Sequence, residues 1–156
     1  MGLFDKVKNL KSNLTGDWAD LSIQFEPAAR GGSVEASTTV TVKDKAITIE
    51  GVIIEVRCEE IIDVPNATHY STSSSTSSGT GRATSTETVF DKEVKAAGPQ
   101  ELAAGSSSTF SASVPIPAHE PPSMNGRNCR YEWEIRARLD MKGNDPDSGW
   151  QDLQIN

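Results

Sequence analysis

The residues best suited to chemistry are few and form no catalytic motif. The two histidines are His69, beside a Ser/Thr-rich tract, and His119, in a proline-rich turn. The sequence contains no Gly-x-Ser-x-Gly elbow and no phosphate-binding glycine loop. A catalytic histidine must be held within reach of a nucleophile or a carboxylate, so surface loop histidines are the simpler interpretation. We predict a protein that is not an enzyme, with no catalytic residue, no cofactor and no small-molecule substrate.

A group of oxygen-bearing residues near the end of the sequence resembles a calcium loop. Asp140, Asn144, Asp145 and Asp147 carry the hard oxygen ligands that Ca²⁺ prefers. Their spacing departs from the EF-hand pattern, and no acid occupies the twelfth position of such a loop. Because Asn-Asp-Pro-Asp-Ser-Gly is ordinary turn sequence, we predict a hairpin turn and no metal site.

The two cysteines, Cys58 and Cys129, form neither a disulfide framework nor a zinc-binding spacing. Each continues the apolar face of a predicted strand, so we interpret both as small buried hydrophobic residues. A disulfide between their strands stays geometrically possible. No secretory signal is visible at the start of the sequence, so we expect a cytoplasmic protein with reduced thiols.

The charge balance excludes two classes of partner. The net charge is −7, and no basic stripe is present to displace counterions from phosphates. We therefore expect no nucleic-acid binding and no broad adhesion to anionic membranes, and no apolar run reaches the length of a membrane span. The remaining partners are another protein or a second copy of the chain.

The first 16 residues form a separate element. Apolar residues at three- and four-residue spacing predict a short amphipathic helix over residues 3–14. A helix of this length is marginal alone in water, so it must pack against something. Its apolar face could cap the following domain, dock a partner, mediate self-association or touch a membrane surface. The candidate partner-binding residues are Leu3, Phe4, Val7, Leu10 and Leu14.

From residue 17 onward the hydrophobic period changes from 3.6 to two. The clearest segment runs from Cys129 to Met141, where seven apolar positions alternate with charged ones. Such alternation indicates a strand with one buried and one solvated face, as in antiparallel sheets. We predict an all-β, immunoglobulin-like antiparallel sandwich over residues 17–156 with about seven strands. The predicted strands cover residues 19–26, 34–42, 46–61, 88–94, 110–116, 129–141 and 150–155.

One long segment differs from this pattern. Residues 71–88 are rich in Ser and Thr, and too little apolar surface is available to offset the entropy of ordering them. We predict a long flexible loop, with a hairpin whose strands extend into its ends as the alternative. Pro115 and Pro117 lack amide donors, so the strand over residues 110–116 should lie at a sheet edge or end early.

Several segments resemble the arrestin-like family in their order along the chain. They are Gly31–Ala36 with Thr39–Val42, Ile47–Glu60, Phe110–Pro117 with Pro121–Gly126, and Tyr131–Asp140. Among members of that family, bacterial sporulation-control proteins are the most similar, because they also open with a short amphipathic segment. The chain has room for only one of the two sandwiches that arrestins carry. The first predicted strand also lacks the lysines with which visual arrestins sense phosphate.

The resemblance implies a fold and a style of function. It predicts an arrestin-like sandwich acting as a non-catalytic protein-binding module, a cytoplasmic adaptor or regulatory scaffold in a bacterium. Fold alone does not establish function. The alternative is a structural subunit that self-associates through an edge strand or the first helix.

Overall fold

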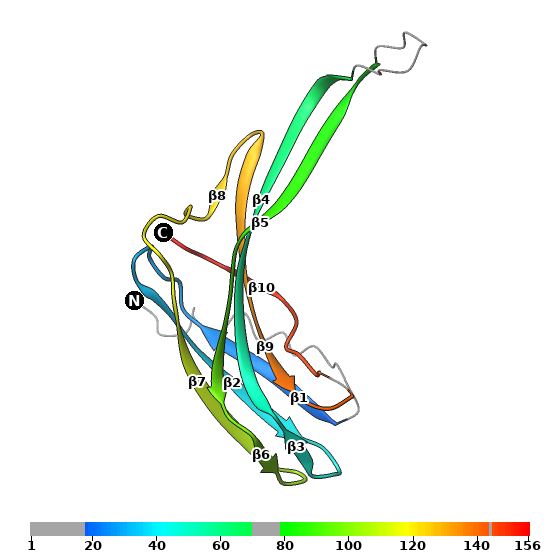
Figure 1. The fold of residues 1–156 in the computed structure, drawn as a ribbon, viewed down its shortest axis with the longest axis vertical. Coiled ribbons are helices and arrows are strands. Elements are labelled where there is room, and N and C mark those ends of the chain that lie inside the picture. Colours follow the sequence, from blue (N-terminus) through cyan, green and yellow to red (C-terminus); the bar gives the residue numbers. More distant parts are fainter. Residues whose placement is uncertain (1–17, 70–78, 144) are drawn as a thin grey trace, which may run out of the picture.

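The computed structural model describes residues 18–69, 79–143 and 145–156, so the predicted helix and its five candidate residues lie outside the described part. The described chain is all β, as predicted, and its paired strands are antiparallel (Figure 1). The strands are β1 (Ala19–Phe25), β2 (Ser33–Val42), β3 (Ile47–Ile49), β4 (Gly51–His69), β5 (Gly79–Ala97), β6 (Gln100–Leu102), β7 (Ser107–Pro115), β8 (Met124–Asn125), β9 (Cys129–Asp140) and β10 (Gln151–Leu153). Their number exceeds the predicted seven because the very short strands β6 and β8 carry too little pattern to be detected and because one predicted strand is divided into β3 and β4.

Two sheets share one hydrophobic core. The first has the order β1-β2-β7, and the second has the order β10-β9-β4-β5, with β8 also paired to β9. Strands β3 and β6 form a small third sheet at the lower end of Figure 1. Over most of β1, β2 and β9 every second residue is buried, which produces the alternation seen in the sequence. The largest fully buried side chains are Leu21, Ile23, Val34, Val40, Ile49, Val52, Ile54, Ile116, Trp133, Ile135, Leu139 and Ile155.

Strand β9 confirms the clearest prediction from the sequence. Trp133, Ile135, Ala137 and Leu139 are buried, and the charged residues between them are at least partly exposed. One edge of β9 pairs with β4. The other edge is covered by β8, by β10 and by Ser148, whose amide donates to the Ala137 carbonyl at 2.8 Å. Strand β7 ends at Pro115 on the edge of the first sheet, which confirms the placement expected from the prolines.

The single strand predicted over residues 46–61 is wrong, because the chain changes sheets at Glu50. Strand β3 pairs with β6, whereas β4 starts at Gly51 and pairs with β5 and β9. The chain passes so close to its neighbour at Gly51 that a Cβ there would lie 3.0 Å from the Ala97 carbonyl oxygen. Both halves are apolar, so their hydrophobic pattern carries no sign of the break.

Residues 79–88 form the first half of β5, so the alternative prediction, a hairpin whose strands extend into the ends of this segment, is confirmed there and the flexible loop is wrong; residues 71–78 lie outside the described residues. The backbone of residues 79–88 is paired with β4 from Glu59 to His69. The threonines favour extended backbone, and the Arg82 guanidinium binds the Asp63 carboxylate, with Nε 2.6 Å from Oδ1. Backbone pairing therefore orders a segment that has little apolar surface to bury.

The β4–β5 hairpin extends beyond the first sheet as an arm (Figure 1). Pairing of β4 with β9 stops at Ile62, and above that point β4 pairs only with β5 among the described residues. Register shifts occur at Val89 on β5 and at Pro65–Asn66 on β4, where Asn66 has a φ of 58°. Bulges of this kind bend and twist a ribbon and accommodate a proline. We use "arm" for residues 59–69 and 79–88.

Candidate interaction surface

The side of the arm that continues the core face of β4 is left uncovered by the first sheet. The core ends at Trp133, whose ring centroid lies 5.1 Å from that of Phe90 and whose Nε1–H donates to the Pro121 carbonyl at 3.0 Å. The alternation of β4 continues past this level without a register shift against β9. Ile62 and Val64 then become 38% and 39% exposed, because no strand of the described residues lies opposite them.

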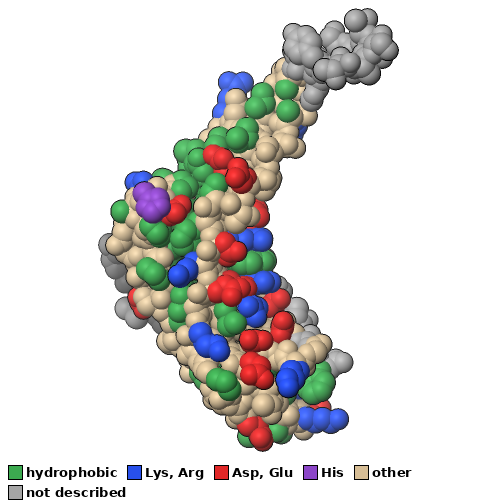
Figure 2. Space-filling model, in the orientation of Figure 1, with side chains coloured by type: hydrophobic (Ala, Val, Ile, Leu, Met, Phe, Trp, Pro, Cys, Tyr) green, Lys and Arg blue, Asp and Glu red, His purple; other side chains and the backbone are tan. Residues whose placement is uncertain are grey.

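We call this surface the arm face. It comprises Glu60, Ile62, Val64, Ser85, Glu87, Met124, Cys129 and Tyr131. Figure 2 shows hydrophobic side chains continuing from the body of the protein onto the arm. Met124 belongs to the arm face because β8 places it opposite Tyr131, and it is 42% exposed. Exposed apolar side chains that gather on one face indicate an interaction site, whereas single scattered ones do not.

Acidic groups flank these apolar side chains. The Tyr131 hydroxyl donates to Glu60 Oε1 at 2.7 Å, and this hydrogen bond, together with partial burial, raises the pKa of Tyr131 to about 12. Glu87 lies opposite Glu60 on β5. The arm face thus combines an apolar centre with two carboxylates and a fixed phenol. A partner segment with apolar side chains and basic neighbours would complement it.

A shallow hollow of about 350 Å³ adjoins the arm face at the edge of β9. It lies between β8 and β10, and Met124 and Tyr131 line both the hollow and the arm face. Arg130 and Glu132 contribute its polar side, and they are paired with each other at 2.6 Å. The hollow therefore extends the arm face sideways and adds polar contacts to it.

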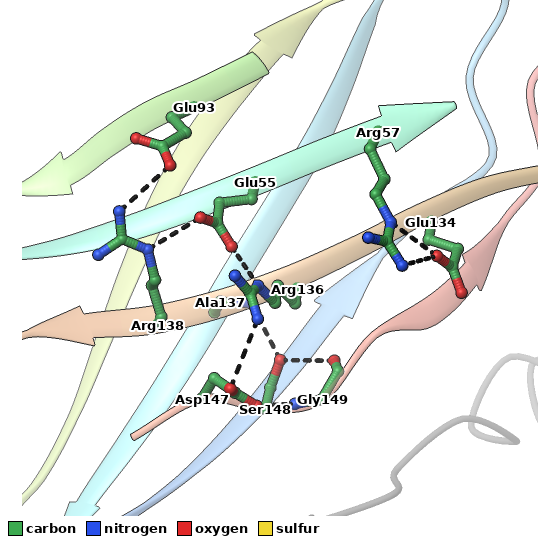
Figure 3. A network of polar contacts seen from close by, with 10 residues as sticks. All are labelled: Glu55, Arg57, Glu93, Glu134, Arg136, Ala137, Arg138, Asp147, Ser148 and Gly149. Carbon is green, nitrogen blue, oxygen red and sulfur yellow. Dashed lines mark hydrogen bonds and ion pairs between the residues drawn. The ribbon is translucent and has the colours of Figure 1, made fainter. Parts of the chain in front are cut away.

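The opposite face of the second sheet carries a ladder of paired charges (Figure 3). Glu55 is its most buried member, 6% exposed, and its carboxylate accepts hydrogen bonds from Arg136 and Arg138. Burial raises the pKa of Glu55, but the hydrogen bonds from the two arginines outweigh that effect, so its pKa is lowered. Arg138 also reaches Glu93 at 3.2 Å.

A second part of the ladder surrounds Trp150. Arg57 binds Glu134 at 2.7 and 2.9 Å. The guanidinium carbons of Arg57 and Arg136 lie 4.1 and 4.5 Å from the centre of the Trp150 ring. Such stacking is favourable because the ring face is electronegative. Since these charges bind one another, we interpret the ladder as structural.

Among the chemically suggestive residues that the structure describes, His119, Asp145 and Asp147 lie in turns and loops. His119 is 80% exposed in its side chain and lies 3.3 Å from Glu120, its chain neighbour. The side chain of His69 is not among those that the structure describes. Asp145 accepts a hydrogen bond from the Met141 amide, and Asp147 accepts one from the Gly149 amide, as turn residues do. Within the described residues, no acidic, His or Cys side chains cluster in a way that could hold a metal ion.

The two cysteines are free, and they differ in exposure. Cys58 is fully buried opposite Trp133, whereas Cys129 is half-buried opposite Ile62. The four-residue offset between their pairing positions corresponds to about 13 Å along the strands, too far for a disulfide. Burial raises the pKa of the Cys58 thiol to about 12, with smaller contributions from Glu120, Glu59 and Glu60.

This difference predicts selective alkylation of the native protein. At pH 8, iodoacetamide should label Cys129 and leave Cys58 unmodified, because the thiolate is the reactive form and Cys58 is both buried and protonated. Peptide mass spectrometry measures each site separately. The unfolded protein should be labelled at both sites. Native labelling of Cys58 as fast as that of Cys129 would contradict the burial described.

The fold defines a class, an all-β protein with two main antiparallel sheets around one core. No protein-family model matches the chain, and no curated protein matches it. Among solved structures the chain is similar to Spo0M, a sporulation control protein from Bacillus subtilis, with a TM-score of 0.60 and 14% sequence identity. The match covers 90% of this chain and 50% of that chain, so the chain spans about half the length of Spo0M. At this identity the likeness shows a shared fold with Spo0M, and it agrees with that part of the sequence resemblance that concerns sporulation-control proteins.

The arm face was not predicted from the sequence. Ile62 and Val64 look like core residues there, because a pattern of alternation does not show where the opposing sheet ends. The described residues include no helix long and apolar enough to cross a lipid bilayer.

Proposed function

We propose that the protein is a non-catalytic, protein-binding regulatory module built on an arrestin-type β-sandwich. The arm face carries this proposal: it exposes Ile62 and Val64 on the β4–β5 hairpin, and Met124 of β8 on the same side of the sheet, across β9. The fold shared with Spo0M, a sporulation control protein, supports a regulatory role. The paired charges of the opposite face and the exposed side chain of His119 favour binding over catalysis.

The proposed partner is a cytoplasmic protein that offers apolar side chains with basic neighbours. Ile62 and Val64 would be covered by the apolar side chains, and Glu60 and Glu87 would face the basic ones. The five apolar residues of the predicted helix remain a second predicted partner-binding surface: Leu3, Phe4, Val7, Leu10 and Leu14.

Photo-crosslinking in cells tests this proposal. A benzoylphenylalanine residue in place of Ile62 should form discrete adducts with one or a few proteins, which mass spectrometry identifies. The same residue in place of Thr48, which is exposed on β3 away from the arm, is the matched control. The substitution Val64→Asp should reduce the Ile62 adducts severalfold, because it places an unpaired charge in the apolar centre. Equal adducts from both positions, or none from Ile62, would refute the proposal.

A further inference from the structure

The free edge of the arm suggests a specific mode of self-association. Strand β5 is the terminal strand of the second sheet, and no described strand pairs with its outer edge. Its side chains from Thr84 to Val89 are all exposed. A long unpaired edge is a template for another strand unless charges, prolines or bulges block it.

The two halves of β5 differ in this respect. The lower half, from Val89 to Ala97, lies beside β7. It contains Val89 and Ala96, the two bulge residues of β5 that have no partner on β4 and shift the register. It also holds four closely spaced charged residues, Asp91, Lys92, Glu93 and Lys95. The upper half, from Gly79 to Thr88, has no register shift on its own strand, no proline, and only Arg82 and Glu87 as charged residues. The bulges and closely spaced charges that usually prevent a free strand edge from pairing are therefore confined to the lower half of β5.

The backbone groups available on this edge follow from the pairing of β4. The Asp63 amide donates to the Asn128 carbonyl at 2.8 Å. The backbone N–H and C=O groups of the odd-numbered residues in this part of β4 therefore point toward β9, and those of the even-numbered residues point toward β5. Ser85 and Glu87, which lie opposite Ile62 and Glu60, therefore bond to β4. The amides and carbonyls of the even-numbered residues between Thr80 and Thr88 point outward.

We propose that this edge pairs antiparallel with the same edge of a second copy, centred on Thr84. This register uses the whole stretch between Gly79 and Val89 and makes about ten backbone hydrogen bonds. Thr84 lies opposite Thr84 of the second copy, Arg82 opposite Thr86, and Glu87 opposite Gly81. No like charges face each other, and β-branched residues are favourable in cross-strand pairs. The two arms form one four-stranded sheet with both arm faces on the same side.

This inference goes beyond the proposed function, because it uses the strand edge and leaves the arm faces free. Sedimentation equilibrium of the full chain, over concentrations from about 1 to about 500 μM, should show a dimer of the 16.7 kDa chain. A monomer throughout this range would overturn the inference, and the photo-crosslinking result at Ile62 would stand independently.

Charge substitutions at the symmetry position test the register. Thr84→Lys and Thr84→Glu each place two like charges directly opposite each other, so each variant alone should dimerise at least about tenfold more weakly. An equimolar mixture should recover the dimer, because the introduced lysine then faces the introduced glutamate. Thr48→Lys, the same change at an exposed strand position away from the arm, should leave dimerisation unchanged. Thermal melts confirm that each variant is folded.

Three results would overturn the proposed pairing: a dimer insensitive to both Thr84 substitutions, a mixture that fails to recover it, and an equal effect of Thr48→Lys. A fourth comes from the predicted helix. If Leu10→Asp in the full chain dissociates the dimer as strongly as Thr84→Lys does, the helix is the assembly element and the strand edge is not.

Discussion

Replacing Trp133 with alanine should destabilise the protein by about 3–5 kcal/mol, the largest effect that we expect from a single substitution. Trp133 is 2% exposed at the end of the core, where its ring packs against Phe90 and its indole N–H is bound to the Pro121 carbonyl. The substitution leaves a cavity and removes the partner of a carbonyl. Urea unfolding followed by circular dichroism measures the loss.

Trp150→Ala is the matched control, because it makes the same change on the solvent face of the same sheet. Trp150 is partly exposed, and its main contacts with charge are the stacked guanidiniums of Arg57 and Arg136. Stacking of this kind contributes about 0.5–1 kcal/mol at exposed sites, so the loss should be clearly smaller. Equal losses for the two tryptophans would mean that the core does not end at Trp133.

Glu55→Gln should cost about 1–3 kcal/mol at pH 7, because it leaves Arg136 and Arg138 without their shared carboxylate. The folded-state pKa of Glu55 is lowered, so its contribution is complete above the unfolded pKa of about 4.3. That contribution disappears as the pH falls through the lowered folded pKa. The free energies of unfolding of the wild type and the variant should therefore converge at low pH, as urea titrations at pH 7 and in strong acid would show.

Glu93→Gln provides the comparison for this pH dependence. Glu93 is 53% exposed in its side chain and binds Arg138 alone among the ladder arginines, so its removal should cost less than about 1 kcal/mol. If Glu55→Gln were no more costly than Glu93→Gln, or equally costly at neutral and acid pH, the proposed role of Glu55 at the centre of the ladder would be wrong.

The sequence was most informative where one face of a strand is buried and the other solvated. The alternation in β9, from Cys129 to Asp140, predicted both the strand and its inward side chains. The hydrophobic pattern did not predict the strand over residues 79–88. These residues are ordered by backbone pairing with β4, and the spacing of apolar residues carries no sign of such pairing. The pattern also failed at Glu50, where the chain leaves one sheet for another within a continuous apolar run.

The interaction surface was harder to predict than the fold. Ile62 and Val64 continue the inward face of β4, and their exposure depends on how far the first sheet reaches, which is a property of strands distant in sequence. The free edge of β5 depends likewise on which strand happens to be terminal in the sheet. The local hydrophobic pattern shows neither how far the first sheet reaches nor which strand is terminal.

The neighbours of β4 also determine the order in which the chain can fold. Its partner β5 follows within the same hairpin, and hairpins of this kind form on a timescale of about 1–10 μs. Its other partner, β9, lies far along the chain, with Arg57 and Glu134 separated by 77 residues. Closing so large a loop costs entropy before the contacts form, so we expect the pairing of β9 with β4 to be the slow step. Before β9 pairs, the edge of β4 that will bind β9 has free backbone groups. We therefore expect the chain to be most prone to aggregation at this stage of folding.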